Sequence, residues 1–340
     1  MVWYKMETDA TWTIFDVYCG LGGFTSGALQ AFNDNGISNI RVIGLDSDKT
    51  PLAAFKLNVA ATGVADVQTI CKIVGTDTIE WPEENDRLII HFSPCCQPFS
   101  KARSSPPTQC DADNGLAQIT LILDLVISMG YKRWSLEEVS NPRVVALVQD
   151  YATKYPSVVA FEVIDAVSYG CPSERRRLIA THPNVLEDLK SNTTTAFRPP
   201  KRAFEEYGIE PASEFYRNGN TSCVPRPISR PGFTVTASHP LVFCHRDRSL
   251  VRCMRPSESA ALVGFCKKWT LPSGVGAAQR AVGNAVSPML SHAIVGSEFR
   301  VRFPGPATIA EVKSNGDEFV SRAEVEAMIA SAIAAYRNTL

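Results

Sequence analysis

The chain has 340 residues, of which 45% are hydrophobic and 20% charged, and its formal net charge at pH 7 is −1. These values are ordinary for a globular protein with one large core and a smaller lobe. A net charge near zero excludes a globally basic nucleic-acid binder, so any basic surface must be local. The ten cysteines show no CxxC pairs or regular spacing, which argues against a zinc site or a disulfide framework and favours reduced thiols inside a cell. Nothing before Trp12 has the pattern of a signal peptide, and no apolar run approaches the ~18 residues of a membrane span.

The first predicted element is a β-strand over residues 13–18, followed by a glycine-rich turn and a helix over residues 24–32. Glycines in such a turn let the backbone approach a nucleotide-type ligand closely. The turn alone is weak evidence, because a purely structural turn or a nicotinamide site has the same pattern. Its candidate ligand-binding residues are Asp16, Tyr18, Cys19, Gly20, Leu21, Gly22 and Gly23.

A second predicted strand, residues 40–45, ends in Asp46-Ser47-Asp48. An acidic residue at this position suits a bidentate hydrogen bond to the hydroxyls of a ribose. A solvent-exposed turn aspartate is a fair alternative for Asp48 and a poor one for Asp46. We therefore expect Asp46 and its neighbour Ser47 to contact the ligand.

Residues 88–92 form an apolar run typical of a buried parallel strand, and a proline-bounded turn follows at residues 93–100. Side chains at the carboxyl end of such a strand point into the ligand crevice of an α/β sheet. A lone cysteine is most often a buried structural residue, but Cys96 becomes a candidate nucleophile here if its thiolate is favoured and accessible.

The segment 101–107 predicts a basic surface loop, and residues 117–129 predict an apolar helix that covers one face of the sheet.

The next predicted strand, residues 132–136, ends in Glu137-Glu138. A carboxylate at the end of one strand, near a nucleophile at the end of another, is a candidate acid or base. A solvated helix start before Pro142 is the alternative, and the position relative to Cys96 favours the functional role for Glu137. Two adjacent carboxylates can raise a pKa, which suits a proton donor and leaves the role of Glu138 open.

A β-rich run at residues 158–166 predicts a further strand, and three consecutive arginines enter another strand at residues 178–180. Arginines in this place can hold a phosphate or donate to the carbonyl oxygen of a base. A solvated basic patch is the alternative.

Several of these segments resemble motifs of the cytosine-C5 DNA methyltransferases. Residues 96–100 are similar to the catalytic loop Pro-Pro-Cys-Gln-x-Phe-Ser, with Cys95 in place of the second proline. Residues 16–24 are similar to Asp-x-Phe-x-Gly-x-Gly-Gly-Phe, with which the family holds S-adenosylmethionine, and Tyr18 stands where the family has phenylalanine. Residues 137–139 resemble Glu-Asn-Val, with Glu138 in place of asparagine.

Two more segments extend the resemblance to about residues 12–298. Residues 169–177 resemble Tyr-Gly-x-Pro-Gln-x-Arg-x-Arg, with Ser173 in place of glutamine, which implies Arg175 and Arg177 as candidate catalytic residues. Residues 283–288 resemble the closing Gly-Asn-x-Val-Pro. The aspartate with which the family meets the adenine amino group has no clear match; Ile70-Cys71-Lys72 occupies roughly that place.

The resemblance implies a doubly wound, Rossmann-like α/β methyltransferase domain with a small inserted target recognition domain. It implies a DNA (cytosine-5-)-methyltransferase of the prokaryotic or viral single-chain modification type, with S-adenosylmethionine as cofactor and no metal. By the mechanism of that family, the resemblance implies that the Cys96 thiolate adds to C6 of a flipped-out cytosine. It implies that Glu137 interacts with N3 and the exocyclic amino group. The family's last motif folds back onto the glycine turn. The further cofactor contacts that the resemblance implies are Pro94, Asn284, Ala285 and Val286.

The predicted organisation has four parts. Residues 1–182 are the catalytic and cofactor-binding domain, residues 183–272 a short recognition lobe, residues 273–303 a return segment, and residues 304–340 a linker with an amphipathic helix. That helix is expected to pack on the protein's own core, with self-association as the alternative. The location is expected to be cytoplasmic in a prokaryote, and nuclear or undetermined for a virus or a eukaryote.

The expected partner is double-stranded DNA. Between residues 226 and 255 there are six arginines and one acidic residue, a local basic patch that suits phosphate contacts and has no carboxylate-rich surroundings. The candidate DNA-binding residues are Gln97, Ser100, Lys101, Arg103, Arg226, Arg230, Arg246 and Arg248. Three alternatives stay open: an RNA cytosine methyltransferase, a catalytically inactive DNA-binding relative suggested by the changes at Cys95, Glu138 and Ser173, and a nicotinamide dehydrogenase.

Overall fold

The computed structural model describes residues 11–75, 77–99, 108–194, 198–210, 213–217, 224–244 and 249–303. Five of the predicted DNA-binding residues lie outside these ranges: Ser100, Lys101, Arg103, Arg246 and Arg248. The side chain of Gln97 and the predicted C-terminal helix also lie outside the described part.

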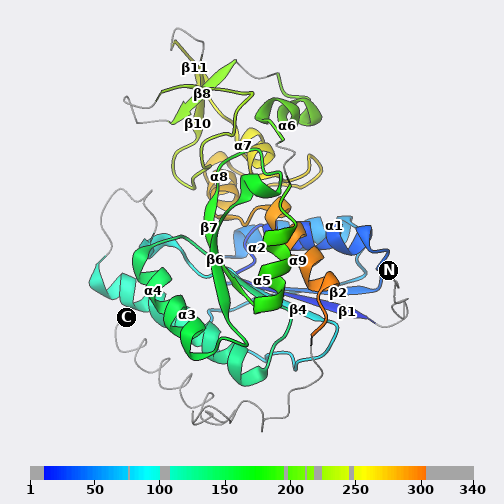
Figure 1. Ribbon diagram of the computed structural model, residues 1–340. Helices are drawn as coiled ribbons and strands as arrows, with labels where there is room; N and C mark the ends of the chain where they lie inside the picture. Colours follow the sequence, from blue (N-terminus) through cyan, green and yellow to red (C-terminus); the bar gives the residue numbers. More distant parts are fainter. Residues whose placement is uncertain are drawn as a thin grey trace.

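A seven-stranded sheet with the order β3-β2-β1-β4-β5-β7-β6 forms the centre of the larger body (Figure 1). Neighbouring strands from β3 to β5 are parallel, whereas β7 runs antiparallel to both β5 and β6. The predicted doubly wound α/β fold is thereby confirmed. The strands are β1 (Trp12–Val17), β2 (Ile40–Asp46), β3 (Asp66–Cys71), β4 (Leu88–Phe92), β5 (Trp134–Glu138), β6 (Ala160–Asp165) and β7 (Arg176–Thr181).

Helices cover both faces of this sheet, and alternate side chains of β1 enter the two resulting cores. Ile14 packs with the helices on one face, and Phe15 packs with those on the other. The first face carries α1 (Gly23–Asp34), α2 (Lys49–Ala61) and α9 (Pro288–Arg300); the second carries α3 (Gln109–Met129) and α4 (Pro142–Lys154). All five residues of β4 are buried, as the apolar run predicts.

Helix α3 begins at Gln109 rather than at residue 117, where the sequence analysis placed its start. Thr108 and Asp111 form a capping box: the Asp111 N–H donates to Thr108 Oγ1, and the Thr108 N–H donates to Asp111 Oδ2, both at 3.1 Å. The first two turns of α3 are polar, so the run of apolar residues that predicted the helix does not include them. By length and composition alone α3 is apolar enough to cross a membrane, but its buried side chains pack against the sheet and α4.

The packing of α9 on α1 depends on two glycines of α1. A Cβ atom on Gly23 would lie 2.1 Å from the carbonyl oxygen of Val286, and one on Gly27 would lie 2.1 Å from that of Pro288. Neither distance is possible between real atoms, so only glycine allows the helices to approach this closely. The return segment therefore closes directly onto the first turn of the chain.

A smaller lobe lies above the main sheet in Figure 1 and contains an antiparallel sheet with the order β11-β10-β8-β9. Its strands are β8 (Glu214–Arg217), β9 (Arg226–Pro227), β10 (Leu241–Cys244) and β11 (Leu250–Cys253), beside α6 (Pro200–Tyr207), α7 (Pro256–Val263) and α8 (Val275–Asn284). Its buried aromatic side chains Phe204, Phe215 and Phe243 belong to the same cluster as those around α1 and α2. The lobe thus shares its core with the main body.

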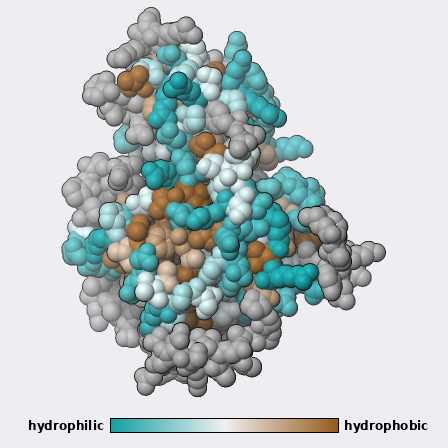
Figure 2. All heavy atoms as spheres, viewed as in Figure 1, coloured by the Kyte–Doolittle hydropathy of each residue, from teal (hydrophilic) through white to brown (hydrophobic). Residues whose placement is uncertain are grey.

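Helix α5 (Pro183–Ser191) falls inside the predicted lobe but packs elsewhere. Its buried residues Leu186 and Leu189 join a cluster with Ile164 of β6 and Ile294 of α9. The edge strand β6 is only partly covered. Figure 2 shows apolar residues gathered in the middle of this face, below the lobe, with hydrophilic residues around them.

Glu298 of α9 is fully buried, and neither of its carboxylate oxygens has a hydrogen-bond partner among the described residues. Burial raises the pKa of Glu298 to about 8, and the positive charge of Arg133 opposes this only in part. At neutral pH the side chain is therefore a protonated acid in an apolar setting.

We expect Glu298→Gln to stabilise the protein increasingly as the pH rises. Because the pKa of Glu298 is about 8 when folded and 4.5 ordinarily, the unfolded chain loses this proton first. The free energy of unfolding then falls by up to about 1.4 kcal/mol per pH unit in that window. Glutamine has no such proton to lose. Urea unfolding at pH 5 and pH 8 measures the difference, with the exposed Glu187→Gln as control; an equal gain at both pH values would contradict the assignment.

Candidate active site

The carboxyl ends of the parallel strands and the amino end of β7 meet at one edge of the main sheet, because β7 runs in the opposite direction. This edge receives Cys96 from the loop after β4, Glu137 from the end of β5, and Arg177 from the start of β7. The Ser93 N–H donates to the Val17 carbonyl at 3.1 Å, and Ser93 Oγ donates to the Tyr18 carbonyl at 3.2 Å. The predicted nucleophile loop and the predicted glycine turn are therefore joined.

The glycine turn holds three left-handed residues within five positions: Tyr18 at φ 60°, Gly20 at φ 49° and Gly22 at φ 86°. Glycine adopts this conformation freely, whereas tyrosine adopts it at a cost. The turn is fixed from β2, since the Gly20 N–H donates to Asp46 Oδ2 at 2.8 Å. The other oxygen of Asp46 accepts the Asp48 N–H at 2.8 Å. Burial raises the pKa of Asp46.

Asp48 has a structural role that the sequence left open. It is exposed, and its side chain accepts the Thr50 N–H at 2.9 Å as the N-cap of α2. Exposed Ser47 lies beside the end of β3, where Cys71 Sγ donates to the Ser47 carbonyl at 3.7 Å. No acidic residue stands at that strand end, in agreement with the missing adenine-binding aspartate.

Asp16 lies below the turn at the end of β1 and is 1% exposed. Its Oδ2 accepts the Thr25 hydroxyl at 2.7 Å and the Thr25 N–H at 3.3 Å, while Oδ1 has no hydrogen-bond partner in the described part of the chain. Burial raises the pKa of Asp16 to about 7. One buried acceptor atom is thus available beneath the turn.

Two contacts join the turn and α2 to Trp269 and Thr270, which sequence reasoning missed. The Trp269 indole N–H donates to the Leu21 carbonyl at 2.9 Å. Asn58 of α2 and Thr270 form two reciprocal hydrogen bonds of 2.8 and 2.7 Å. The partners in each pair lie more than 200 residues apart in the sequence, so no local pattern could reveal either pairing.

The return segment reaches the turn as the resemblance implies. Val286 is buried, with its carbonyl oxygen against Gly23, and Ala285 is buried beside it. Asn284 is exposed at the end of α8.

Cys96 is half-buried, next to the exposed Cys95 and the buried Pro94. The Phe99 N–H donates to the Cys96 carbonyl at 3.0 Å, and the Asn141 amide donates to the Phe99 carbonyl at 3.3 Å, which ties the loop to the start of α4. Burial raises the pKa of Cys96 to about 12; the charges of Glu138 and Glu137 add to the rise, and Arg177 opposes it. In this state the group is a thiol.

Glu137 forms an ion pair with Arg177, with 2.8 Å between Oε1 and Nε, and both side chains are nearly buried. Arg175 is 2% exposed, and two of its guanidinium nitrogens donate to the Gly283 carbonyl at 3.3 Å. Burial lowers the pKa of Arg175 to about 10, so it stays charged at neutral pH. Of the two predicted arginines, Arg177 lies against the predicted acid, while Arg175 links β7 to α8.

Comparison by sequence finds no matching protein-family description and no matching curated protein. Comparison by structure finds an E. coli prophage-encoded protein described as a DNA modification methyltransferase, at 15% identity over 85% of this chain and 99% of that one, with a TM-score of 0.58. The S. pombe Dnmt2 methyltransferase matches at 13% identity over 86% and 99%, with a TM-score of 0.58. The Entamoeba histolytica methyltransferase EhMeth matches at 15% identity over 86% and 99%, with a TM-score of 0.53.

The chain has the fold of these methyltransferases.

The arginines of the basic stretch 226–255 have surroundings that differ from the prediction. Arg226 pairs with Glu174 at 2.7 Å and lies 4.0 Å over the Phe233 ring, and Arg252 pairs with Glu258 through two bonds of 2.6 and 2.8 Å. The prediction that these arginines lack carboxylate neighbours is wrong for both, because each partner lies outside the stretch.

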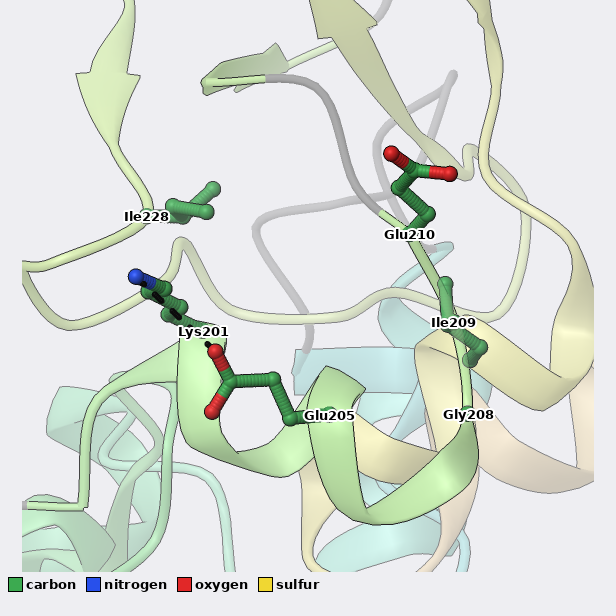
Figure 3. A pocket seen from close by; sticks show the side chains of 6 residues that line it. All are labelled: Lys201, Glu205, Gly208, Ile209, Glu210 and Ile228. Atoms are coloured by element: carbon green, nitrogen blue, oxygen red, sulfur yellow. Dashed lines mark ion pairs between the residues drawn. The ribbon is translucent and has the colours of Figure 1, made fainter.

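Two hollows lie on the lobe of the methyltransferase fold. A groove of about 590 Å³ is lined by Arg226, the exposed Arg230, Glu174, Phe233 and the chain around residues 224–231. A smaller one, about 400 Å³, lies beside α6, where Lys201 and Glu205 form an ion pair of 3.8 Å near Ile209 and Ile228 (Figure 3). None of the residues that line the smaller hollow belongs to the elements carrying Cys96 or the glycine turn.

We expect Arg252→Gln to lower the free energy of unfolding by about 1–3 kcal/mol, because it strips a charged donor from Glu258, which is 2% exposed. Arg230→Gln is the matched control, since Arg230 is exposed. Urea unfolding of both variants measures the effect. Equal free energies of unfolding of the two variants would show that the ion pair between Arg252 and Glu258 does not stabilise the fold.

Proposed function

We propose that the protein transfers a methyl group from S-adenosylmethionine to C5 of a cytosine in double-stranded DNA, through a covalent bond between Cys96 and C6. The observation that carries the proposal is the meeting of Cys96, Glu137 and Arg177 at one sheet edge, directly beside a glycine turn fixed by Asp46. The fold shared with the prophage protein described as a DNA modification methyltransferase supports it.

The residues around the turn fit S-adenosylmethionine. The Asp46 carboxylate at the end of β2 suits the two hydroxyls of a ribose. The Asp16 oxygen without a partner suits a positively charged group. Gly20 has nothing within 4 Å of where a Cβ would be, so the backbone is open to a close ligand approach there. When bound, the cofactor supplies an electrophilic methyl group.

The chain's own residues prepare the base. Cys96 gives up its proton and its sulfur bonds to C6, which moves electron density to C5, otherwise a poor nucleophile. Glu137 acts at N3 and the exocyclic amino group, and Arg177 holds the Glu137 carboxylate in place. After C5 has gained the methyl group, loss of the C5 proton and departure of the Cys96 sulfur restore the ring. A duplex shields C6, so the base must be flipped out at a cost of a few kcal/mol.

Bisulfite sequencing of DNA from cells that express the protein tests this function and reports the recognised sequence together with activity. We expect protected cytosines with the wild type and with Cys95→Pro, which restores the loop that the family has, and none with Cys96→Ser. A purified wild-type protein that binds duplex DNA tightly yet protects no cytosine would leave the inactive DNA-binding relative as the correct interpretation.

A duplex that contains 5-fluorocytosine tests the same chemistry chemically. Fluorine at C5 prevents the final loss of the C5 substituent, so the protein should stay bound through its sulfur. Peptide mapping of the adduct should place it on Cys96. An adduct on the neighbouring Cys95 would refute the assignment of the nucleophile while keeping the proposed reaction.

We expect Asp46→Ala to weaken S-adenosylmethionine binding by ~1.5–3 kcal/mol, the usual worth of a hydrogen bond to a charged group. Asp48→Ala is the matched control, because Asp48 caps α2, and it should change helix stability while keeping cofactor affinity. Titration calorimetry measures both. Unchanged affinity in Asp46→Ala, or a loss in Asp48→Ala instead, would move the ribose contact away from Asp46.

A further inference from the structure

Strand β5 ends in two adjacent carboxylates that have different surroundings. Successive side chains of a strand point to opposite sides, yet both of these are buried: Glu137 is 6% and Glu138 0% exposed. Glu137 has Arg177 as its counter-charge. Glu138 forms no ion pair with any described residue; one of its oxygens accepts the N–H of Val139, and the other, Oε1, has no hydrogen-bond partner there.

A buried carboxylate without a cation is far more costly than a buried neutral acid. Burial raises the pKa of Glu138 to about 8, with Glu137 adding to the rise and Arg177 and the Val139 N–H opposing it. Glu138 is therefore protonated at neutral pH. In that form it is uncharged, like the asparagine that the cytosine-C5 methyltransferases have in this place.

Glu138 lies at the same sheet edge as the candidate nucleophile: β4 and β5 are parallel neighbours with Phe92 opposite Leu136, so the loop that carries Cys96 and the strand end that carries Glu138 start side by side. Among the charged groups that act on the Cys96 thiol, Glu138 raises its pKa most, ahead of Glu137 and Cys95, while Arg177 lowers it. The charge of Arg175 also interacts with Cys96. These groups come from the loop after β4, from β5 and from β7 with the residues before it.

The charges of this cluster decide whether a thiolate is tolerated. With Glu138 protonated, two guanidinium groups, Arg175 and Arg177, face one carboxylate, Glu137, and one positive charge is left over. A Cys96 thiolate balances that charge. With Glu138 ionised, the two arginines already face two carboxylates, so a thiolate would add an unbalanced negative charge to a buried site.

We propose that Glu138 is a positioning residue which keeps Cys96 able to form a thiolate by staying protonated beside it, and which suppresses that thiolate once it loses its own proton. This rests on the proposed function only in taking Cys96 as the reacting group. It gives a reason for the second carboxylate of the Glu-Glu pair: it makes the reactivity of Cys96 depend on pH in the alkaline range, a dependence that asparagine does not give.

The rate of Cys96 alkylation by iodoacetamide, followed by peptide mass spectrometry between pH 6.5 and 10, tests the proposal without any methyl transfer. In the wild type we expect the rate to rise with pH and then flatten near pH 8, where Glu138 ionises. In Glu138→Gln the rise should continue, and at pH 9.5 the rate should exceed that of the wild type by roughly tenfold, the factor that corresponds to one pKa unit at Cys96.

Two further variants make the result decisive. Glu298→Gln neutralises an acid that is equally buried and has a pKa of about 8 as well, but that lies on α9 near Arg133; it should keep the wild-type profile. Glu138→Asn removes the same charge with the family's residue and should reproduce the profile of Glu138→Gln. A break near pH 8 that persists in both Glu138 variants, or that is absent from the wild type, would overturn the proposal.

The outcome also separates this inference from the proposed function. Cytosine methylation together with identical alkylation profiles of wild type and Glu138→Gln would refute the role of Glu138 alone. A changed alkylation profile in a protein that methylates no DNA would refute the proposed function and keep the coupling between Glu138 and Cys96.

Discussion

The reversed direction of β7 is the constraint on which the candidate site depends. In the parallel part of the sheet only the carboxyl ends of strands reach the ligand edge, and these ends carry the candidate nucleophile Cys96 and the candidate acid Glu137. If β7 ran parallel to β5, the arginines at its amino end would lie at the opposite edge of the sheet. Because β7 pairs antiparallel with β5, with Ile179 opposite Glu137 and Leu178 opposite Glu138, Arg177 comes to lie against Glu137. The counter-charge of the site thus follows from topology.

Charge in this region is set by partners rather than by residue type. Asp16 and Glu138 at this edge, and Glu298 beside Arg133 away from it, are all carboxylic acids whose burial raises the pKa to about 7 or 8. None of them has a guanidinium within ion-pair distance in the described residues. Glu137, buried nearly as deeply, has the Arg177 guanidinium at 2.8 Å. A buried site can therefore hold several acidic side chains with little net charge, and a bound ligand meets fewer negative charges than the sequence suggests.

Local patterns predicted the elements that need only local causes. The all-apolar run of β4 is buried on both faces, and the glycines of the first turn adopt the left-handed conformations that favour glycine. What the sequence could not supply were the partners. Arg226 finds Glu174, 52 residues earlier, across the junction between lobe and body. The charge count within residues 226–255 leaves out carboxylates from other parts of the chain that lie close in space. Fewer arginines of this stretch are therefore free to contact phosphates than the count predicts.

The lobe is joined to the glycine turn and to α2 by its own core. Phe204 and Phe243 of the lobe belong to one buried cluster with Phe55 of α2. Where the chain leaves the lobe, the Trp269 indole N–H donates to the Leu21 carbonyl in the glycine turn. A displacement of the lobe must be transmitted to the turn, because close-packed cores have few ways to absorb it. Any ligand held by the lobe and any ligand held by the turn consequently act on the same buried side chains, and such an effect on binding is reciprocal by thermodynamic necessity.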